Sequence, residues 1–142
     1  MPDNSFRFVY AVPVRFHDLD AMGHAHHSLP LIYMEEARAA YWRDIAGKDG
    51  LTQIDYVIGS FSLRFIQRIH FPGVVRVGLR VSRLGTSSFT MQYELHDENG
   101  QLLATGESTQ VMYDYTNNTS KPIPPEVRSR IEAYEPSLSA LS

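Results

Sequence analysis

One long helical segment constrains the fold of this chain more than any other feature of its sequence. Residues 28–46 are predicted to form a helix, with Ser28 capping its start and Gly47 following its end. Pro30 fits this assignment, because a proline is tolerated in the first turn of a helix. A surface helix has one apolar stripe, whereas apolar residues surround much of this segment. The rest of the domain is therefore expected to wrap around this helix.

The remaining chain has the alternation and composition of β-strands. Residues 6–16 place apolar side chains at alternate positions, and Pro13 within them predicts an edge strand or a bulge. Later segments are rich in β-branched and aromatic residues, and the Asn99-Gly100 pair between two of them predicts a hairpin. These later predicted strands are 55–69, 74–84, 88–96 and 102–115, followed by a short helix at 125–134. Strands beside one long helix favour an antiparallel α+β domain whose sheet curls around the helix.

The composition argues against several classes of function. A length of 142 residues suits one domain, spanning 1–142. The net charge of −3 and the lack of a dense Lys/Arg run argue against nucleic-acid binding, and no apolar run approaches the roughly 20 residues that span a membrane. Residues 1–5 lack the pattern of a signal peptide, and a chain without cysteine has no disulfide and no thiolate nucleophile. We therefore expect a cytoplasmic protein.

A polar segment between the first strand and the helix, residues 15–28, holds most of the candidate chemistry. Asp20 lies a few residues before the helix start, where unpaired backbone N–H groups carry about half a positive charge. Such amides polarise a carbonyl group and stabilise the anion of a tetrahedral intermediate. A nearby carboxylate attacks that carbonyl carbon or activates a water to do so. One short segment thus supplies two halves of an acyl-transfer site.

The motif around Asp20 resembles a known family. Arg15-Phe16-His17-Asp18-Leu19-Asp20-Ala21-Met22-Gly23-His24, followed by the helix with Glu35-Glu36-Ala37-Arg38, is similar to the 4-hydroxybenzoyl-CoA thioesterase family of the hot-dog superfamily. Weaker similarity covers nearly the whole chain, including the ending Lys121-Pro122-Ile123-Pro124. The resemblance implies a hot-dog fold, in which a curled antiparallel sheet wraps one long buried helix. It also implies an acyl-CoA thioesterase without a cofactor, working as a homodimer or homotetramer (dimer of dimers) with CoA thioesters bound at a subunit interface.

The family pattern assigns roles to individual residues. The second aspartate of its Asp-x-Asp motif is the catalytic carboxylate, a nucleophile or general base, and it matches Asp20. The amide that polarises the thioester carbonyl lies four residues after the glycine of the motif, so Gly23 points to His27. The sequence departs from the family pattern at two places. The usual Gly-His-x-Asn-Asn is Gly-His-Ala-His-His here, and Pro30 replaces an aromatic residue that is common in the first helical turn. The backbone donor at His27 survives both changes, whereas the lining of the acyl pocket differs.

The histidines near Asp20 have three interpretations. They are His17, His24, His26 and His27. With the aspartates they suit zinc or non-haem iron, but their spacing matches no compact ligand motif, and we expect no metal. A histidine beside Asp20 is alternatively a proton shuttle or a modulator of the Asp20 pKa, and the third interpretation is packing within the loop. Asp18 is expected to turn the loop or pair with Arg15, and an Asx-turn or helix cap is the structural alternative for Asp20.

Residues outside this segment complete the predicted substrate site. A charged group on a buried helix needs a partner, so Glu36 is expected to form a structural ion pair or to position water or the neighbouring loop. Ser62 and Arg64 are expected to reach the partner subunit's site, with Arg64 either near CoA phosphates or in solvent. The alternating stripe of Phe61, Leu63 and Phe65 is expected in the core first and in the acyl pocket second. The predicted substrate-binding residues are Gly23, His24, His26, Glu36, Ser62 and Arg64.

The sequence favours hydrolysis of an acyl-CoA thioester to the free acid and CoA. A thiol is a good leaving group, so no strong general acid is required beside Asp20. A hot-dog dehydratase or hydratase is the competing enzyme class, since those enzymes usually pair a histidine with an acidic residue. The motif is also compatible with a non-catalytic acyl-CoA-binding domain and, less well, with a metal-dependent hydrolase. The acyl group, and the choice between CoA and acyl carrier protein, are not fixed by the sequence.

Overall fold

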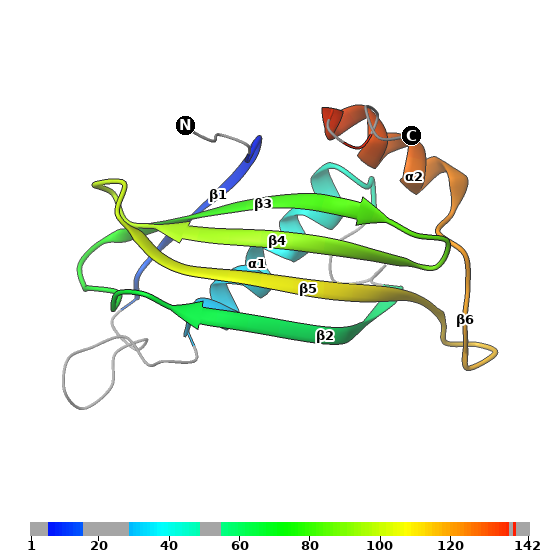
Figure 1. The fold of residues 1–142 in the computed structure, drawn as a ribbon, viewed down its shortest axis with the longest axis horizontal. Coiled ribbons are helices and arrows are strands. Elements are labelled where there is room, and N and C mark those ends of the chain that lie inside the picture. Colours follow the sequence, from blue (N-terminus) through cyan, green and yellow to red (C-terminus); the bar gives the residue numbers. More distant parts are fainter. Residues whose placement is uncertain (1–5, 16–28, 49–54, 137, 139–142) are drawn as a thin grey trace.

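The computed structural model of the chain describes residues 6–15, 29–48, 55–136 and 138. Its helices and strands follow the order predicted from sequence: a strand, a long helix, a run of strands and a short closing helix (Figure 1). The elements are β1 (Phe8–Pro13), α1 (Leu29–Asp44), β2 (Tyr56–Phe65), β3 (Val74–Leu84), β4 (Ser88–His96), β5 (Leu102–Asp114), β6 (Thr119–Ser120) and α2 (Pro125–Tyr134).

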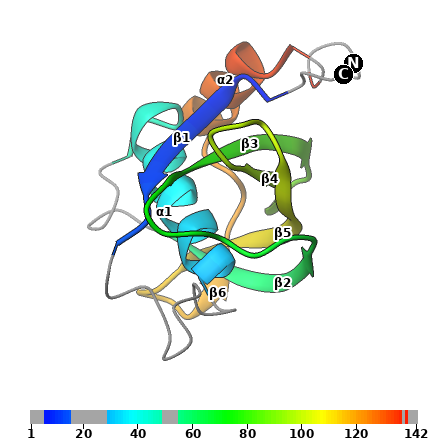
Figure 2. The same ribbon diagram turned by 90° about the vertical axis from the view of Figure 1, so that its left-hand side faces the viewer.

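The strands form one antiparallel sheet in the order β1-β3-β4-β5-β2, with β6 paired to β5. Pro13 accordingly ends an edge strand, as predicted, because a residue without an N–H disturbs a sheet least at its edge. The sheet curls around α1, which lies in its hollow (Figure 2). This is the hot-dog arrangement of the α+β class that the sequence predicts.

The core forms between α1 and the inner face of the sheet. Trp42 of α1 stacks on Phe89 of β4, with ring centroids 5.3 Å apart and an interplanar angle of 3°. The sheet does not enclose the helix completely, because Ile32 and Glu35 remain exposed. The prediction of a wrapped helix is thus confirmed for most of its circumference, while a narrow strip stays open. The fully buried side chains of α1 include Tyr33, Met34, Ala37, Tyr41 and Trp42.

Two strands are several residues shorter than the sequence predicts, a third, β5, ends one residue earlier, and one strand was not predicted. β1 covers only Phe8–Pro13, the length over which it pairs with β3. β2 ends at Phe65 because the amides of Ile66 and Gln67 both donate to the carbonyl of Leu103, at 2.9 and 3.0 Å, and the ladder with β5 stops there. β6 has only two residues, too few to carry an alternating pattern.

Candidate functional site

The predicted catalytic segment lies outside the described residues. Asp20, Gly23, His24, His26 and His27 all fall within residues 16–28. The structure describes the two flanks of this segment, Arg15 on one side and the first residue of α1 on the other. The roles assigned to the five residues therefore remain predictions.

The start of α1 follows directly on that segment. Leu29 and Pro30 form part of its first turn, and both are buried, so this end of the helix is held against the core. The first turn contains no acidic side chain that would neutralise the positive end of the helix dipole. An electropositive helix end thus follows the segment that contains Asp20, as the proposed chemistry requires.

Glu36 forms an ion pair with Arg15. Arg15 Nη2 lies 2.9 Å from Glu36 Oε2, and the Arg15 Cζ atom lies 5.9 Å from the centroid of the Tyr33 ring. Arg15, just beyond β1, therefore contacts two residues on one face of α1. The pair supports the structural interpretation of Glu36, and it joins the flanks of the undescribed segment.

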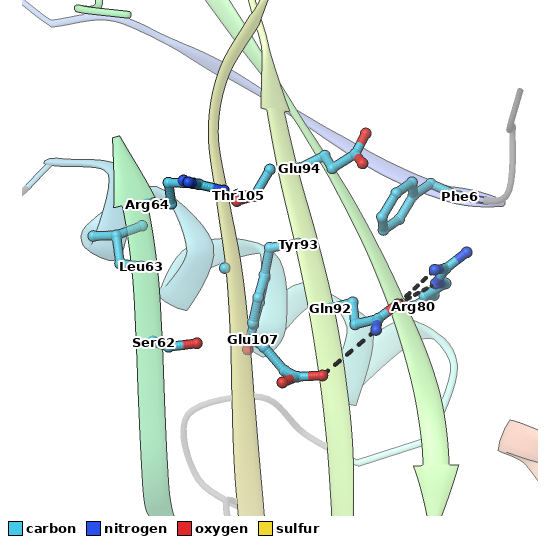
Figure 3. Close-up of a pocket in the computed structure, with 11 residues that line it drawn as sticks. Phe6, Ser62, Leu63, Arg64, Arg80, Gln92, Tyr93, Glu94, Thr105 and Glu107 are labelled. Atoms are coloured by element: carbon cyan, nitrogen blue, oxygen red, sulfur yellow. Dashed lines mark hydrogen bonds between the residues drawn. The ribbon is translucent and has the colours of Figure 1, made fainter. Parts of the chain in front are cut away.

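Ser62 and Arg64 lie together on the outer face of the sheet, turned away from α1. Gly106, the partner of Leu63, faces the helix, because a Cβ atom added to it would lie 2.9 Å from Met34 Sδ. Ser62 and Arg64 alternate with Leu63 along β2 and therefore point to the opposite face. Both line a cleft of about 430 Å³ (Figure 3). The structure thus brings these two predicted residues together but places them on the face opposite Glu36.

The cleft is polar and contains groups of both charges. Arg80 Nε donates to Gln92 Oε1 at 2.8 Å, and Gln92 Nε2 lies 3.5 Å from Glu107 Oε2 (Figure 3). The Arg80 guanidinium also lies over the Phe6 ring, 4.8 Å from its centroid. Sequence reasoning missed these residues, because only the pairing register shows that Arg80, Gln92, Glu107 and Ser62 form one row across four strands.

A second polar cluster lies between α1 and the sheet. Arg38 is only 6% exposed, and its Nη1 donates to the Tyr93 hydroxyl at 3.0 Å. The Tyr93 and Ser108 hydroxyls are 2.6 Å apart, and Ser108 donates to Gln110 Oε1 at 2.8 Å. The Glu35 carboxylate lies 3.9 Å from Arg38, beyond hydrogen-bond length. Burial lowers the pKa of Arg38, but its contacts with tyrosine hydroxyls outweigh burial and raise that pKa overall.

The alternation of β5 contains a sequence signal for this cluster. Ser108 and Gln110 occupy alternate positions of β5 on the same side as Met112, which is fully buried. Two polar residues on the apolar side of a strand need buried partners. The fold supplies Tyr93 as the partner of Ser108, and Tyr93 in turn accepts a hydrogen bond from Arg38 on the buried helix.

Comparison with known proteins decides the family. Residues 14–131 match the sequence model of the thioesterase-like superfamily. The chain belongs to the thioesterase-like superfamily. One solved structure similar to this chain is a thioesterase of Thermus thermophilus in complex with coenzyme A and zinc. It is 32% identical, with a TM-score of 0.84, over 94% of this chain and 98% of the other.

Two further proteins are similar to this chain. The uncharacterised protein YsmA of Bacillus subtilis strain 168 is 29% identical over 102 residues, which cover 72% of this chain and 69% of that protein. The Staphylococcus aureus protein SAV2348, solved in complex with CoA, has a TM-score of 0.83 over 92% of this chain and 85% of its own, but its 16% identity supports the fold alone. Superfamily membership confirms the resemblance inferred from the motif around Asp20.

The sequence predicted neither a membrane-spanning segment nor a metal site. Among the described residues, no helix is long and apolar enough to cross a membrane. Within the same residues, no three His, Asp or Glu side chains gather into a group that suits a metal ion. The histidines of residues 17–27 lie outside the described ranges, so the absence of a metal there stays a prediction.

Proposed function

We propose that this member of the thioesterase-like superfamily hydrolyses an acyl-CoA thioester to a free acid and CoA. The observation that carries the proposal is the family match over residues 14–131, which spans the whole Asp20 motif and α1. The bound coenzyme A of the 32% identical Thermus thermophilus thioesterase supports the choice of substrate class.

In the proposed mechanism, Asp20 and the His27 amide act on the same carbonyl group. The thioester oxygen accepts a hydrogen bond from the His27 N–H at the start of α1, which polarises the carbonyl and stabilises the developing oxyanion. Asp20 either attacks the carbon, forming an anhydride that water then opens, or takes a proton from an attacking water. In both routes the C–S bond breaks, water supplies the new oxygen of the acid, and the CoA thiolate takes up a proton.

The other predicted residues have supporting roles in the proposed site. Gly23, His24 and His26 are assigned to the wall around the acyl carbonyl. Glu36 acts through its pair with Arg15, which holds the flanks of the catalytic segment together, so its role is positioning. Arg64, beside Ser62 in the outer cleft, suits the phosphates of CoA, because guanidinium groups bind phosphate oxygens well.

A second copy of the chain completes the proposed site. Ile58 and Phe65 on the inner side of β2 are 42% and 52% exposed, and β2 is an edge strand. Exposed apolar side chains at an unpaired edge favour association. We propose that a homodimer or a dimer of dimers covers this strip, and that the acyl group binds in a pocket shared by two chains.

A panel of acyl-CoA thioesters, with released thiol followed over time, tests the proposal. The wild type should hydrolyse at least one of them, and Asp20→Asn should lose roughly 10²–10⁴-fold in kcat while still binding acyl-CoA. Asp44→Asn, an exposed aspartate at the far end of α1, is the matched control and should stay active. Equal thiol release by the wild type and Asp20→Asn would remove Asp20 from the mechanism. Binding without turnover by the wild type would favour an acyl-CoA-binding domain instead.

A further inference from the structure

The hydrogen-bond chain beneath α1 has a fixed direction. Arginine carries only donors, so the Tyr93 hydroxyl accepts from Arg38 and turns its own proton elsewhere. The Ser108 oxygen at 2.6 Å is a better acceptor for that proton than Met91 Sδ at 3.8 Å. Ser108 then donates to Gln110 Oε1. The buried charge of Arg38 thereby orients the Gln110 amide, with Nε2 at the far end of the chain.

Gln110 Nε2 ends this chain as a donor without an acceptor. The side chain is fully buried, and no described residue accepts a hydrogen bond from Nε2. A buried polar group without a partner is costly, and nearly all such groups in folded proteins have one. An amide held in one orientation by a buried cation is therefore ready to bind an acceptor from outside the described part of the chain.

The position of Gln110 relates this donor to the proposed acyl pocket. Gln110 lies on the inner face of the sheet, paired with Ile58 of the edge strand β2. The inner side of β2 continues from Ile58 through Phe61 to Leu63. Leu63 pairs with Gly106, and Gly106 faces Met34, which lies near the start of α1. An apolar strip of roughly 15 Å thus runs from the early turns of α1 to the Gln110 amide, at about 3.3 Å per strand residue.

We propose that Gln110 recognises a hydrogen-bond acceptor on the acyl group of the substrate, a hydroxyl, oxo or carboxylate oxygen remote from the thioester. This inference rests on the proposed thioesterase function. The acyl chain lies along the β2 strip, and its oxygen accepts from Gln110 Nε2. An unsubstituted acyl group leaves the donor unpaired, and sites built to form a hydrogen bond discriminate strongly against analogues that lack the bonding group.

Matched substrates test the proposal. Each pair consists of an ω-hydroxyacyl-CoA and the unsubstituted acyl-CoA of the same chain length. The wild type should show a higher kcat/KM for the hydroxylated member at one chain length, and Gln110→Met should reduce that preference at least about tenfold. Thr109→Val, on the opposite face of the same strand, should leave the preference unchanged. An unchanged preference in Gln110→Met, or a wild type that prefers the unsubstituted member at every length, overturns the proposal.

A second variant and a binding measurement separate this proposal from the proposed function. Gln110→Leu also removes both N–H donors and leaves no polar hydrogen in their place, so it should lose the preference as Gln110→Met does. Thermal shifts with the free ω-hydroxy acid and its unsubstituted parent require no turnover. In one outcome, the wild type hydrolyses no thioester and is still stabilised more by the hydroxy acid than by its parent, with this difference lost in both variants. That result would reject the proposed hydrolysis and support the acceptor site. Equal shifts for both acids in the wild type would reject the acceptor site.

Discussion

The Tyr41 hydroxyl donates a 2.6 Å hydrogen bond to Glu135, which joins the residue that follows α2 to the buried side of α1. The same carboxylate oxygen accepts the backbone N–H of Val81 at 2.9 Å. β1 pairs with β3 only as far as Leu79, so Glu135 satisfies an amide of β3 that lies beyond the end of β1. With 3% of its surface exposed, Glu135 is a buried carboxylate that holds α1, β3 and the end of α2 together.

Replacing Glu135 should change how the stability depends on pH. Burial raises the Glu135 pKa, and its hydrogen bonds with Tyr41 and Val81 lower it by less. A carboxyl group with a raised pKa binds its proton more tightly in the folded state. Its contribution to stability is therefore present below the unfolded pKa, about 4.3, and is lost as the pH rises through the raised value. The free energy of unfolding of the wild type should thus fall, relative to that of Glu135→Gln, as the pH rises from about 4 to 8.

Urea denaturation of both proteins across that pH range measures the effect. The charges of Arg7 and Arg80 both lower the Glu135 pKa, and the variant keeps both arginines. Glu126→Gln, an exposed glutamate in the first turn of α2, is the control and should follow the wild-type curve. Parallel curves for the wild type and Glu135→Gln would show that the folded and unfolded pKa values are equal.

Phe89→Ala should destabilise the fold strongly. Phe89 is fully buried, and it contacts the rings of both Trp42 and Tyr56. Removal of a buried phenyl ring leaves a cavity and typically costs about 3–5 kcal/mol. Val9→Ala, at an exposed position of β1, should change the free energy of unfolding by no more than about 0.5 kcal/mol. The urea midpoint at constant m-value measures both, and similar midpoints for the two variants would contradict the stacked core.

The sequence predicted the elements well where a long periodic pattern ends at a strong turn signal. Gly100, in the hairpin between β4 and β5, adopts a φ of 83°, which favours glycine and matches the predicted Asn-Gly turn. α2 begins at Pro125, as predicted, because proline suits the first turn of a helix. Local chemistry alone was sufficient at both places.

Relations between distant residues could not be predicted in the same way. The pair of Arg15 and Glu36 spans 21 positions of sequence, and the bond between Arg38 and Tyr93 spans 55. Asp18, which was expected to turn the loop or to pair with Arg15, lies outside the described residues, so that expectation stays a prediction. The alternation along β2 predicted Leu63 on the core side and Ser62 on the other side, but not that Phe65 stays 52% exposed, because that depends on the place of β2 at the edge of the sheet.

Exchanging the charges of Arg15 and Glu36 should separate ion pairing from substrate contact at Glu36. The side chains are 38% and 32% exposed, so the pair should contribute about 0.2–1 kcal/mol to stability. Arg15→Ala and Glu36→Ala should each reduce kcat by loosening the flanks of the catalytic segment, and Arg15→Glu with Glu36→Arg should recover most of the loss. Steady-state kinetics and a double-mutant cycle in urea provide the two measurements. A charge exchange that recovers stability but not kcat would show that Glu36 contacts the substrate.

Arg64→Ala should weaken the binding of CoA esters but not that of substrates without CoA phosphates. Arg64 lines the outer cleft and is exposed. A well-formed charge-assisted hydrogen bond is worth about 1.5–3 kcal/mol. Because solvent weakens the contact of an exposed group, we expect KM to rise about threefold to tenfold. The rise should shrink with added salt, because salt screens exposed charges. Hydrolysis of the matching acyl-pantetheine, which lacks the phosphates, should be unaffected by the substitution. Arg76→Ala removes an exposed arginine of β3 that does not line the cleft and should leave both values of KM unchanged. If Arg64→Ala raises KM equally for the CoA ester and the pantetheine ester, Arg64 acts elsewhere than on the phosphates.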